Sequence, residues 1–379
     1  MEKITFFHCG DIHLDWKFSS LSDKPGLPKE RREDILRSFL GLIGKAKEKK
    51  PDFLFVAGDL FEQEYTSSRT MLTLVKAFSE IPSTRVVLIP GNHDFEAGNS
   101  FYKTTTWNEN VFFLGEENHC RVFEAQNTCI HGIGFGPGHG QSHRIQGMRL
   151  DPGRINILLF HGDIDLKIGQ RDYNAVTSGM LASKNFDYVA AGHTHGMKKD
   201  IGGHKMIFNP GSLEPLGFDE PGVHGYFEGS LEKGKPPAIE FIPHAGTVYI
   251  EEKADITGIS SDEELEKLLA SRMDDRKALY KMILTGKKPL FYQPDSRAVG
   301  KKLADKCRYV KIRDDSKTAV TREELALMKG LRGSFARLML EKMEKSRDGD
   351  EVILLGRALH YGITAIEEGR LDLDFGEDS

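Results

Sequence analysis

The chain has 379 residues, which at about 150 residues per domain is enough for two or three domains. Hydrophobic residues make up 39% and charged residues 29% of it, a composition that is typical of folded proteins and excludes a mainly disordered one. Its 52 basic and 57 acidic residues give a net charge of −5. Net charge alone would therefore not hold nucleic acid, and a polyanionic substrate would need a local basic patch or bound cations.

The sequence predicts neither a membrane anchor nor an exported protein. No stretch reaches the roughly 18 apolar residues that cross a bilayer, and Asp11 interrupts an N-terminal apolar run that is too short for a signal peptide. Cys9, Cys120, Cys129 and Cys307 form no CxxC pair, so neither a disulfide scaffold nor a zinc knuckle is predicted. We expect a cytoplasmic protein.

Up to about residue 215, short apolar runs alternate with amphipathic segments. Ile35 and Phe39 lie on one face of a predicted helix between the first two runs, as do Met71 and Phe78 between the second and third. Runs rich in Val, Ile and Phe are typical of buried strands. Strands alternating with helices predict an α/β fold with a central sheet covered by helices. The predicted strands are Ile4–Phe7, Phe53–Ala57, Val86–Ile89, Ile155–Phe160 and Tyr188–Ala191.

Two glycine-rich stretches follow. Residues 132–140 carry a glycine at every second position and predict a loop, more readily a linker than a substrate lid. Residues 233–237 predict the tip of a hairpin.

After about residue 245 the pattern changes to that of a smaller α+β domain. Strands are predicted at Val248–Glu251 and Leu279–Leu284, with a helix at Asp262–Ala270 that Ser261 and Glu264 cap. Thr321–Lys345 and Asp350–Glu368 predict two amphipathic helices that pack on each other or on a partner, and the last residues an acidic tail.

Each of the five predicted strands leads directly into residues able to bind a metal ion. Ligand sites in open α/β sheets lie beyond the carboxyl ends of the strands, and so many polar side chains would be costly to bury without a partner. Imidazole, carboxylate and amide groups without thiolate favour manganese, iron or zinc, and they are too many for one tetrahedral zinc ion. We predict two divalent ions about 3.5–4 Å apart, with Mn²⁺ the expected metal. The groups are Asp11 and His13; Asp59; Asn92, His93 and Asp94; His161; and His193 and His195.

In this order, the motifs D-x-H, G-D, G-N-H-D, H and G-H-x-H resemble the calcineurin-like metallophosphoesterase superfamily over roughly residues 4–215. The resemblance implies a layered α/β/β/α sandwich. It implies one metal held by Asp11, His13, Asp59 and His195, and a second that shares Asp59 and is completed by Asn92, His161 and His193. It also implies that His93 is the catalytic histidine, which assists the leaving oxygen, and that Asp94 orients its ring.

Within the superfamily, residues 11–15, 58–61 and 209–214 resemble the SbcD-type DNA-repair exonucleases, and most closely their YhaO-like branch. This implies a nuclease domain at 1–245, a capping domain that contacts DNA at 246–318, and a C-terminal helical region at 319–379. In SbcD-type nucleases that last region binds a coiled-coil, SMC-like ATPase of the SbcC type, and homodimers are the family's habit. The expected function is a two-metal phosphodiesterase that cleaves DNA in repair, as an exonuclease or endonuclease.

One position departs from the archaeal and eukaryotic nucleases, which carry a histidine after Gly-Asp-Leu-Phe where this chain has Glu62. A carboxylate cannot stack on or donate to a nucleotide as imidazole does, so the sequence does not decide whether the protein is a processive exonuclease. Two alternatives remain. One is a phosphodiesterase or phosphatase for small molecules such as cyclic nucleotides, which would not need the residues after the catalytic domain. The other is a scaffold with a decayed site, which the intact ligand set disfavours.

A basic segment at residues 301–313 is as consistent with phosphate contacts to DNA as with a solvated surface.

Overall fold

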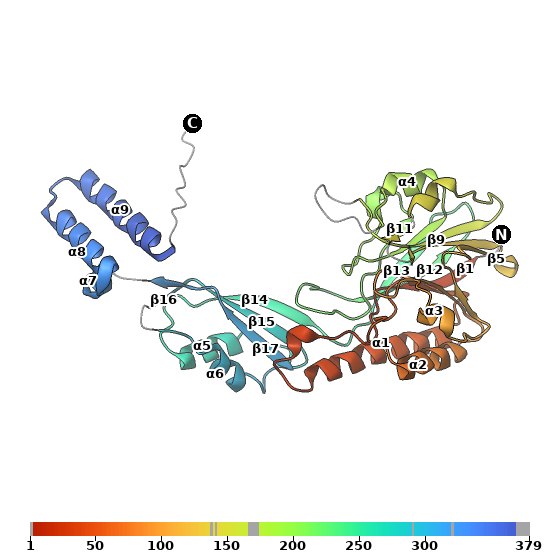
Figure 1. Ribbon diagram of the computed structural model, residues 1–379, viewed down its shortest axis with the longest axis horizontal. Coiled ribbons are helices and arrows are strands. Elements are labelled where there is room, and N and C mark those ends of the chain that lie inside the picture. Colours follow the sequence, from red (N-terminus) through yellow and green to blue (C-terminus); the bar gives the residue numbers. More distant parts are fainter. Residues whose placement is uncertain are drawn as a thin grey trace. The chain divides into compact units, whose positions relative to one another are not determined.

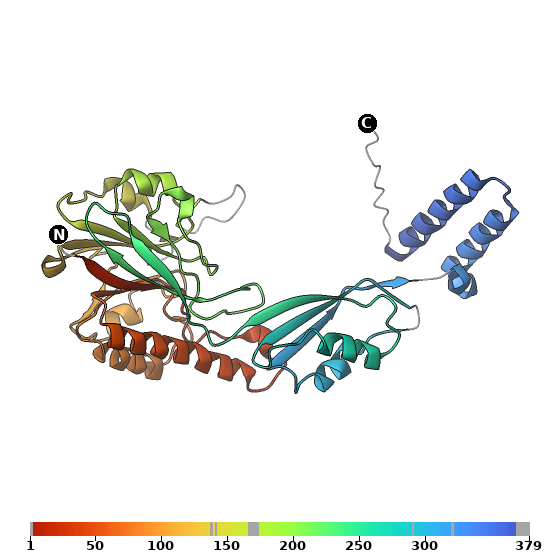
Figure 2. The ribbon, with the colours of Figure 1, turned by 180° about the vertical axis from the view of Figure 1, so that it is seen from behind.

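The computed structural model describes residues 3–136, 139–140, 142–165, 174–289, 292–319 and 322–368. The chain divides into two compact units, one made of residues 1–250 with 277–279 and the other of 251–276 with 280–379 (Figures 1 and 2). The domain limits at 245 and 318 stay predictions. In the part of the chain that is described, no helix is long and apolar enough to cross a membrane.

Two sheets form the centre of the first unit. The first has the order β13-β12-β1-β2-β3-β4 and the second β11-β10-β9-β6-β5. The first sheet contains β1 (Ile4–Cys9), β2 (Phe53–Ala57), β3 (Arg85–Ile89), β4 (Val111–Phe113), β12 (Gly225–Leu231) and β13 (Ala238–Pro243). The second contains β5 (Cys120–Phe123), β6 (Thr128–Ile133), β9 (Ile155–His161), β10 (Tyr188–Gly192) and β11 (Ile207–Phe208). The five predicted strands are confirmed as β1, β2, β3, β9 and β10.

The strands that carry the motifs are parallel within each sheet, β1 with β2 and β3, and β9 with β10. Their carboxyl ends therefore share one edge of the sandwich. Between the sheets lies an apolar core that includes Phe6, Phe55, Ile157 and Tyr188. This core explains why the motif strands are continuous apolar runs, since both faces of each sheet are covered.

Helices cover the outer faces of the two sheets (Figure 1). The helices α1 (Leu27–Lys49) and α2 (Ser68–Ser79) lie on the side of the first sheet, and α4 (Ser178–Ser183) lies on the second. The short α3 (Phe101–Thr104) follows β3. The layers are α/β/β/α, so the predicted fold class is confirmed.

The prediction of a loop at residues 132–140 is wrong for the part that is described. Gly132 is the buried fifth residue of β6, and β7 (Phe135–Gly136) pairs with β8 (His139–Gly140). A Cβ on Gly132 would lie 2.6 Å from the Cβ of Leu114. The glycine therefore allows close packing in the core rather than chain mobility. Residues 137 and 138 lie outside the described residues. The hairpin predicted at 233–237 is confirmed, because β12 and β13 pair on either side of it.

The second unit is α+β. Its three-stranded sheet has the order β14-β15-β17, and α5 begins after Ser261, whose hydroxyl accepts a hydrogen bond from the Glu264 amide at 3.3 Å, as predicted. The elements are β14 (Tyr249–Asp255), α5 (Asp262–Ala270), β15 (Leu279–Thr285), β16 (Lys287–Pro289), α6 (Ser296–Lys302), β17 (Tyr309–Asp314) and β18 (Lys317–Ala319).

The C-terminal region contains α7 (Arg322–Leu327), α8 (Gly330–Lys345) and α9 (Gly349–Glu368). One continuous helix from Thr321 was predicted wrongly, because the chain breaks before Gly330, whose φ is 82°. Helices α7, α8 and α9 pack together through an apolar cluster of Leu325, Ala336, Met339, Leu359 and Ile363, of which Leu325 comes from α7. The predicted acidic tail lies outside the described residues.

Candidate metal centre

The groups predicted to bind metal follow the carboxyl ends of strands from both sheets. Asp11 and His13 follow β1, Asp59 follows β2, Asn92 follows β3, His161 ends β9, and His193 and His195 follow β10. Three sets of side chains could each hold an ion, because their ligand atoms lie within 4.8 Å of one another. The sets are Asp11, His13 and His195; Asp11, Asp59 and His161; and His13, Glu62 and His93.

The backbone at this edge turns sharply to aim the ligands inward. Asp11, His13, Asp59 and His193 all have positive φ, at 49°, 51°, 49° and 92°. Such angles are uncommon for residues other than glycine and cluster at functional sites. The backbone amide of His193 also donates to both carboxylate oxygens of Asp11, each at 3.0 Å. The two sheets are thereby joined at the centre itself.

Glycines precede two of the ligands because the turns approach each other closely. A Cβ on Gly58 would lie 2.2 Å from Nδ1 of His161, and a Cβ on Gly91 would lie 2.1 Å from Oδ1 of Asp59. Any side chain there would displace a ligand. This gives the G-D and G-N motifs a steric reason.

In the first half of the centre, ring nitrogens of His13 and His195 face each other. Nδ1 of His13 donates to Glu62 Oε1 and Nδ1 of His195 to Glu220 Oε1, each at 2.7 Å. In neutral rings both Nε2 atoms then carry lone pairs, and they lie only 3.2 Å apart. Oδ2 of Asp59 is 3.6 Å from Nε2 of His13. A proton or a cation must separate these atoms, so the donor set fits a divalent metal.

The second half is arranged in the same way around His161. Its Nδ1 donates to the carbonyl oxygen of Ala57 at 2.7 Å. Its Nε2 therefore faces Oδ2 of Asp59 at 3.2 Å and the amide oxygen of Asn92 at 3.1 Å. That amide oxygen is also 3.0 Å from Nδ1 of His193. Asp59 faces both halves, which is the position a bridging ligand needs.

In the chain without metal, protons take the place of cations. Burial would lower the pKa of His161, but the charge of Asp59 raises it to about 9. Burial would also lower the pKa of His195, but the hydrogen bond to Glu220 raises it to about 9. Burial would raise the pKa of Asp59, yet the charge of His161 holds it well below its usual range. Burial and the nearby charge of His161 lower the pKa of His193 to about 4. Metal binding would displace such protons.

The hydrogen bonds of Asp94 go to two turns and a tyrosine, not to the ring of His93. This buried carboxylate accepts hydrogen bonds from the amides of Gly91 at 2.6 Å and Leu60 at 2.7 Å, and from the Tyr102 hydroxyl at 2.6 Å. It thus joins the turns after β2 and β3. The ring of His93 is held instead by Glu62, whose Oε2 lies 3.1 Å from Nδ1. The His93 side chain is 34% exposed, and its amide donates to Asp59.

Glu62 therefore has a structural role of its own at the centre. Its two carboxylate oxygens bind the rings of His13 and His93. Burial would raise the pKa of Glu62, but the hydrogen bonds from these two rings lower it, so the carboxylate stays ionised. Its position four residues after Gly58 was visible in the sequence, but we interpreted Glu62 only as the absence of the histidine that the archaeal and eukaryotic nucleases carry there.

Glu220 is a residue that sequence reasoning missed altogether. Besides binding His195, its other oxygen accepts from the hydroxyl of Ser212 at 2.8 Å. Asn209 also supports this loop, since its amide donates to Thr194 O at 2.8 Å. The segment at 209–214 thus braces the loop that carries His193 and His195, and no local pattern marked Glu220.

A cleft of about 640 Å³ opens beside His93. Its wall includes Trp16, Tyr65 and Phe95, of which Tyr65 is 43% and Phe95 37% exposed. The Trp16 ring centroid lies 5.6 Å from that of His93. Exposed aromatic rings such as these can stack on nucleotide bases.

The layered sandwich and a metal centre with two halves around Asp59 are the features of a two-metal hydrolase. Residues 4–197, about half the chain, match the family model of the calcineurin-like phosphoesterases. The chain belongs to this metallophosphoesterase family, whose members use a dinuclear metal site.

Several curated proteins resemble the chain. The uncharacterized metallophosphoesterase YhaO of Bacillus subtilis is 27% identical over 236 residues, 59% of this chain and 56% of that protein. The DNA double-strand break repair protein Mre11 of Methanopyrus kandleri is 25% identical over 62% of this chain and 56% of its own length. The Mre11 protein of Aeropyrum pernix is 25% identical over 75% and 73%. The chain thus spans little more than half the length of the first two relatives.

Proposed function

We propose that the protein is a two-metal phosphodiesterase that cleaves DNA during repair, with Mn²⁺ as the expected metal. The observation that carries the proposal is that Asp59 faces both halves of the centre, beside His93 and the aromatic cleft. The similarity to proteins described as DNA double-strand break repair proteins supports DNA as the substrate.

The ligand residues would hold the two ions. Asp11, His13, Asp59 and His195 would bind one, and Asp59, Asn92, His161 and His193 the other. When bound, such ions activate water and withdraw charge from phosphoryl oxygens. They also explain how a chain of net charge −5, with Glu62 and Glu64 in its cleft, can accept a phosphodiester.

The chain's own contribution to the reaction is to place one proton donor. Glu62 binds Nδ1 of His93, which leaves Nε2 as the ring atom that can give a proton to the departing oxygen. Trp16 and Glu62 restrict the ring from two sides, and Asp94 keeps the turn beneath it in place. The exposed rings of Tyr65 and Phe95 would stack on bases next to the scissile bond.

The C-terminal helices are proposed to bind a coiled-coil, SMC-like ATPase. Large apolar side chains remain exposed on this region, including Leu327 at 83%, Leu331 at 71% and Leu354 at 66%. Exposed apolar side chains on helices can dock on the apolar face of a partner helix. A homodimer is the companion expectation.

Hydrolysis by the full chain tests the proposal. The manganese-loaded protein is given end-labelled single- and double-stranded DNA and, separately, bis-p-nitrophenyl phosphate. His93→Ala should lower DNA cleavage by roughly 100- to 10,000-fold, the usual contribution of a general acid, with bound manganese unchanged. Hydrolysis of the nitrophenyl diester should fall much less, because nitrophenolate leaves without needing a proton. His143→Ala changes an exposed histidine outside the centre and serves as the matched control.

Each outcome separates the candidate functions. DNA cleavage that disappears with chelator and with His93→Ala supports the nuclease. Hydrolysis of the small diester without DNA cleavage favours a phosphodiesterase or phosphatase for small molecules. If a metal-loaded sample hydrolyses neither, the chain is a scaffold and the proposal is wrong.

A further inference from the structure

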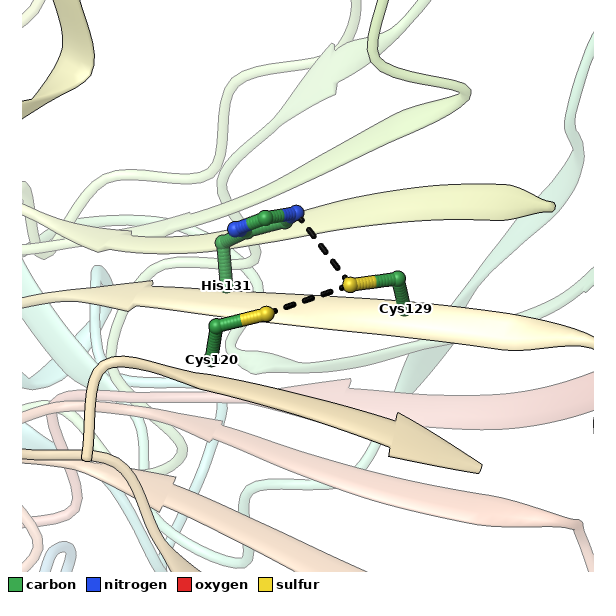
Figure 3. A group of neighbouring side chains, drawn as sticks. All are labelled: Cys120, Cys129 and His131. Carbon is green, nitrogen blue, oxygen red and sulfur yellow. Dashed lines mark hydrogen bonds between the residues drawn. The ribbon is translucent and has the colours of Figure 1, made fainter. Parts of the chain in front are cut away.

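A second group of metal-binding side chains lies away from the dinuclear centre, at the edge of the second sheet. Cys120 is the first residue of the edge strand β5, and Cys129 and His131 lie on the neighbouring β6 (Figure 3). Cys129 and His131 are two residues apart, so their side chains share one face of the sheet. In the antiparallel register Cys120 is directly opposite His131. All three side chains therefore meet.

The distances within this group are close to those between ligands of a shared cation. Sγ of Cys120 lies 3.2 Å from Sγ of Cys129, and that sulfur lies 3.4 Å from Nε2 of His131. A tetrahedral Zn²⁺, with Zn–S of about 2.3 Å and Zn–N of about 2.0–2.1 Å, sets two sulfurs about 3.8 Å apart and sulfur about 3.5 Å from nitrogen. Shifts of a few tenths of an ångström would reach that geometry. A disulfide, with its bond of about 2.05 Å, would require more than 1 Å of movement.

The surroundings hold two of the ligands in place. Cys129 is 6% and His131 5% exposed, and the His131 ring lies edge-on to Phe186 at 6.0 Å. Thiolate is the form of cysteine that binds metal, so binding of the ion would displace the thiol protons.

We propose that Cys120, Cys129 and His131 form a mononuclear site for Zn²⁺, separate from the dinuclear centre. Two thiolates and one imidazole are a ligand set that selects a thiophilic ion, whereas the dinuclear centre offers only carboxylate, imidazole and amide groups. Because Cys120 is exposed, water can take the fourth position. The ion would tie the edge strand β5 to β6.

Cobalt binding to the reduced full-length protein tests the site. Co²⁺ takes the place of zinc and gives a thiolate-to-metal charge-transfer band in the near ultraviolet only when sulfur binds it. Cobalt in the dinuclear centre lacks sulfur ligands and does not give this band. We expect the band in the wild type and its displacement when Zn²⁺ is added.

Variants locate the band. Cys120→Ser should abolish it and, as an exposed conservative change, should leave the circular dichroism spectrum intact. His131→Ala should weaken cobalt binding by at least the roughly 10- to 100-fold that loss of a supporting group costs. Cys307→Ala removes a cysteine outside the group and should keep the band. The proposal is wrong if the reduced wild type gives no charge-transfer band, or if Cys120→Ser retains it. A Cys120–Cys129 disulfide in a protein that fails to bind cobalt after reduction would also overturn it.

Discussion

The two compact units of the chain differ in where they depart from the usual rule of apolar inside and polar outside. The first unit buries polar groups: Asp11, His13 and His161 are all 0% exposed at the ends of its strands. The second unit exposes apolar ones, with Leu327 at 83% and Leu331 at 71%. Each departure is costly for an isolated chain, and a bound cation in the first case or an apolar partner surface in the second would offset that cost.

From this difference we infer which part of the function each unit carries. Buried acceptors at 3.1–3.2 Å from one another can bind only small cations or protons. Exposed leucines on helices bind other apolar surfaces. We therefore expect changes in the first unit to act on metal binding and hydrolysis, and changes in the second to act on affinity for DNA or a partner.

Asp59→Asn should have the largest effect, because Asp59 faces both halves of the metal centre. Loss of the bridging charge should lower hydrolysis of bis-p-nitrophenyl phosphate by about 1,000-fold or more. Bound manganese, measured by elemental analysis, should fall with it. Full activity with both ions retained would contradict the bridging role and remove the contrast between the units.

Arg31→Met should have the largest effect on stability. Arg31 is fully buried, and its guanidinium binds Asp34 at 2.7 Å, the Pro215 carbonyl at 2.9 Å and Glu214 at 3.4 Å. Removing it leaves the buried carboxylate of Glu214 without its cation, at a cost of about 3–5 kcal/mol in the free energy of unfolding.

Urea unfolding measures this change. Arg32→Met is the matched control, since Arg32 makes only a long hydrogen bond of 3.4 Å to the carbonyl of Lys17. It should change the unfolding free energy by less than about 0.5 kcal/mol. Equal losses from the two substitutions would show that the Arg31 network contributes little.

Glu62→Gln should reduce hydrolysis by roughly 10- to 100-fold, the usual cost of losing a residue that orients a metal ligand. The amide keeps the shape of the side chain but cannot accept hydrogen bonds from both His13 and His93 with both of its terminal atoms. Steady-state hydrolysis of the small diester measures the effect. Glu64→Gln, two residues on, should change the rate by less than about twofold, and a similar loss there would assign the effect to cleft charge instead.

Reversing the charge of Lys301 and Lys302, which are exposed on α6, should have the smallest effect. Each lost phosphate contact should lower the slope of log affinity against log salt by about 0.9, with hydrolysis of the small diester unchanged. DNA binding titrations at several salt concentrations measure this. Lys342→Glu with Lys345→Glu is the matched control on α8. An unchanged slope would show that these lysines of the second unit make no contact with DNA phosphates.

Tertiary contacts decided several features that sequence reasoning missed. Cys129 and His131 share a strand face, a signal visible in the sequence, but Cys120 joins them only through the register of β5 with β6. Gly132 lies in a strand that packs so closely against Leu114 that no side chain would fit at this position. The break before Gly330 is stabilised by Arg337, which donates to the carbonyls of Ala326 and Met328 at 2.8 and 3.0 Å. These contacts join residues that no local pattern relates.

The sequence by itself determined the motif strands, the Ser261 cap of α5 and the identity of the candidate ligands, because hydrophobic runs, capping residues and strand-end motifs are local properties of the chain. Only the tertiary structure decided what holds each ligand. Glu62 orients His13 and His93, Glu220 and the carbonyl of Ala57 each orient one further histidine, and the hydrogen bonds of Asp94 go to the turns rather than to the ring of His93. Such partners are set by distance in space, and Glu220 shares no sequence spacing with its histidine that could have predicted their hydrogen bond.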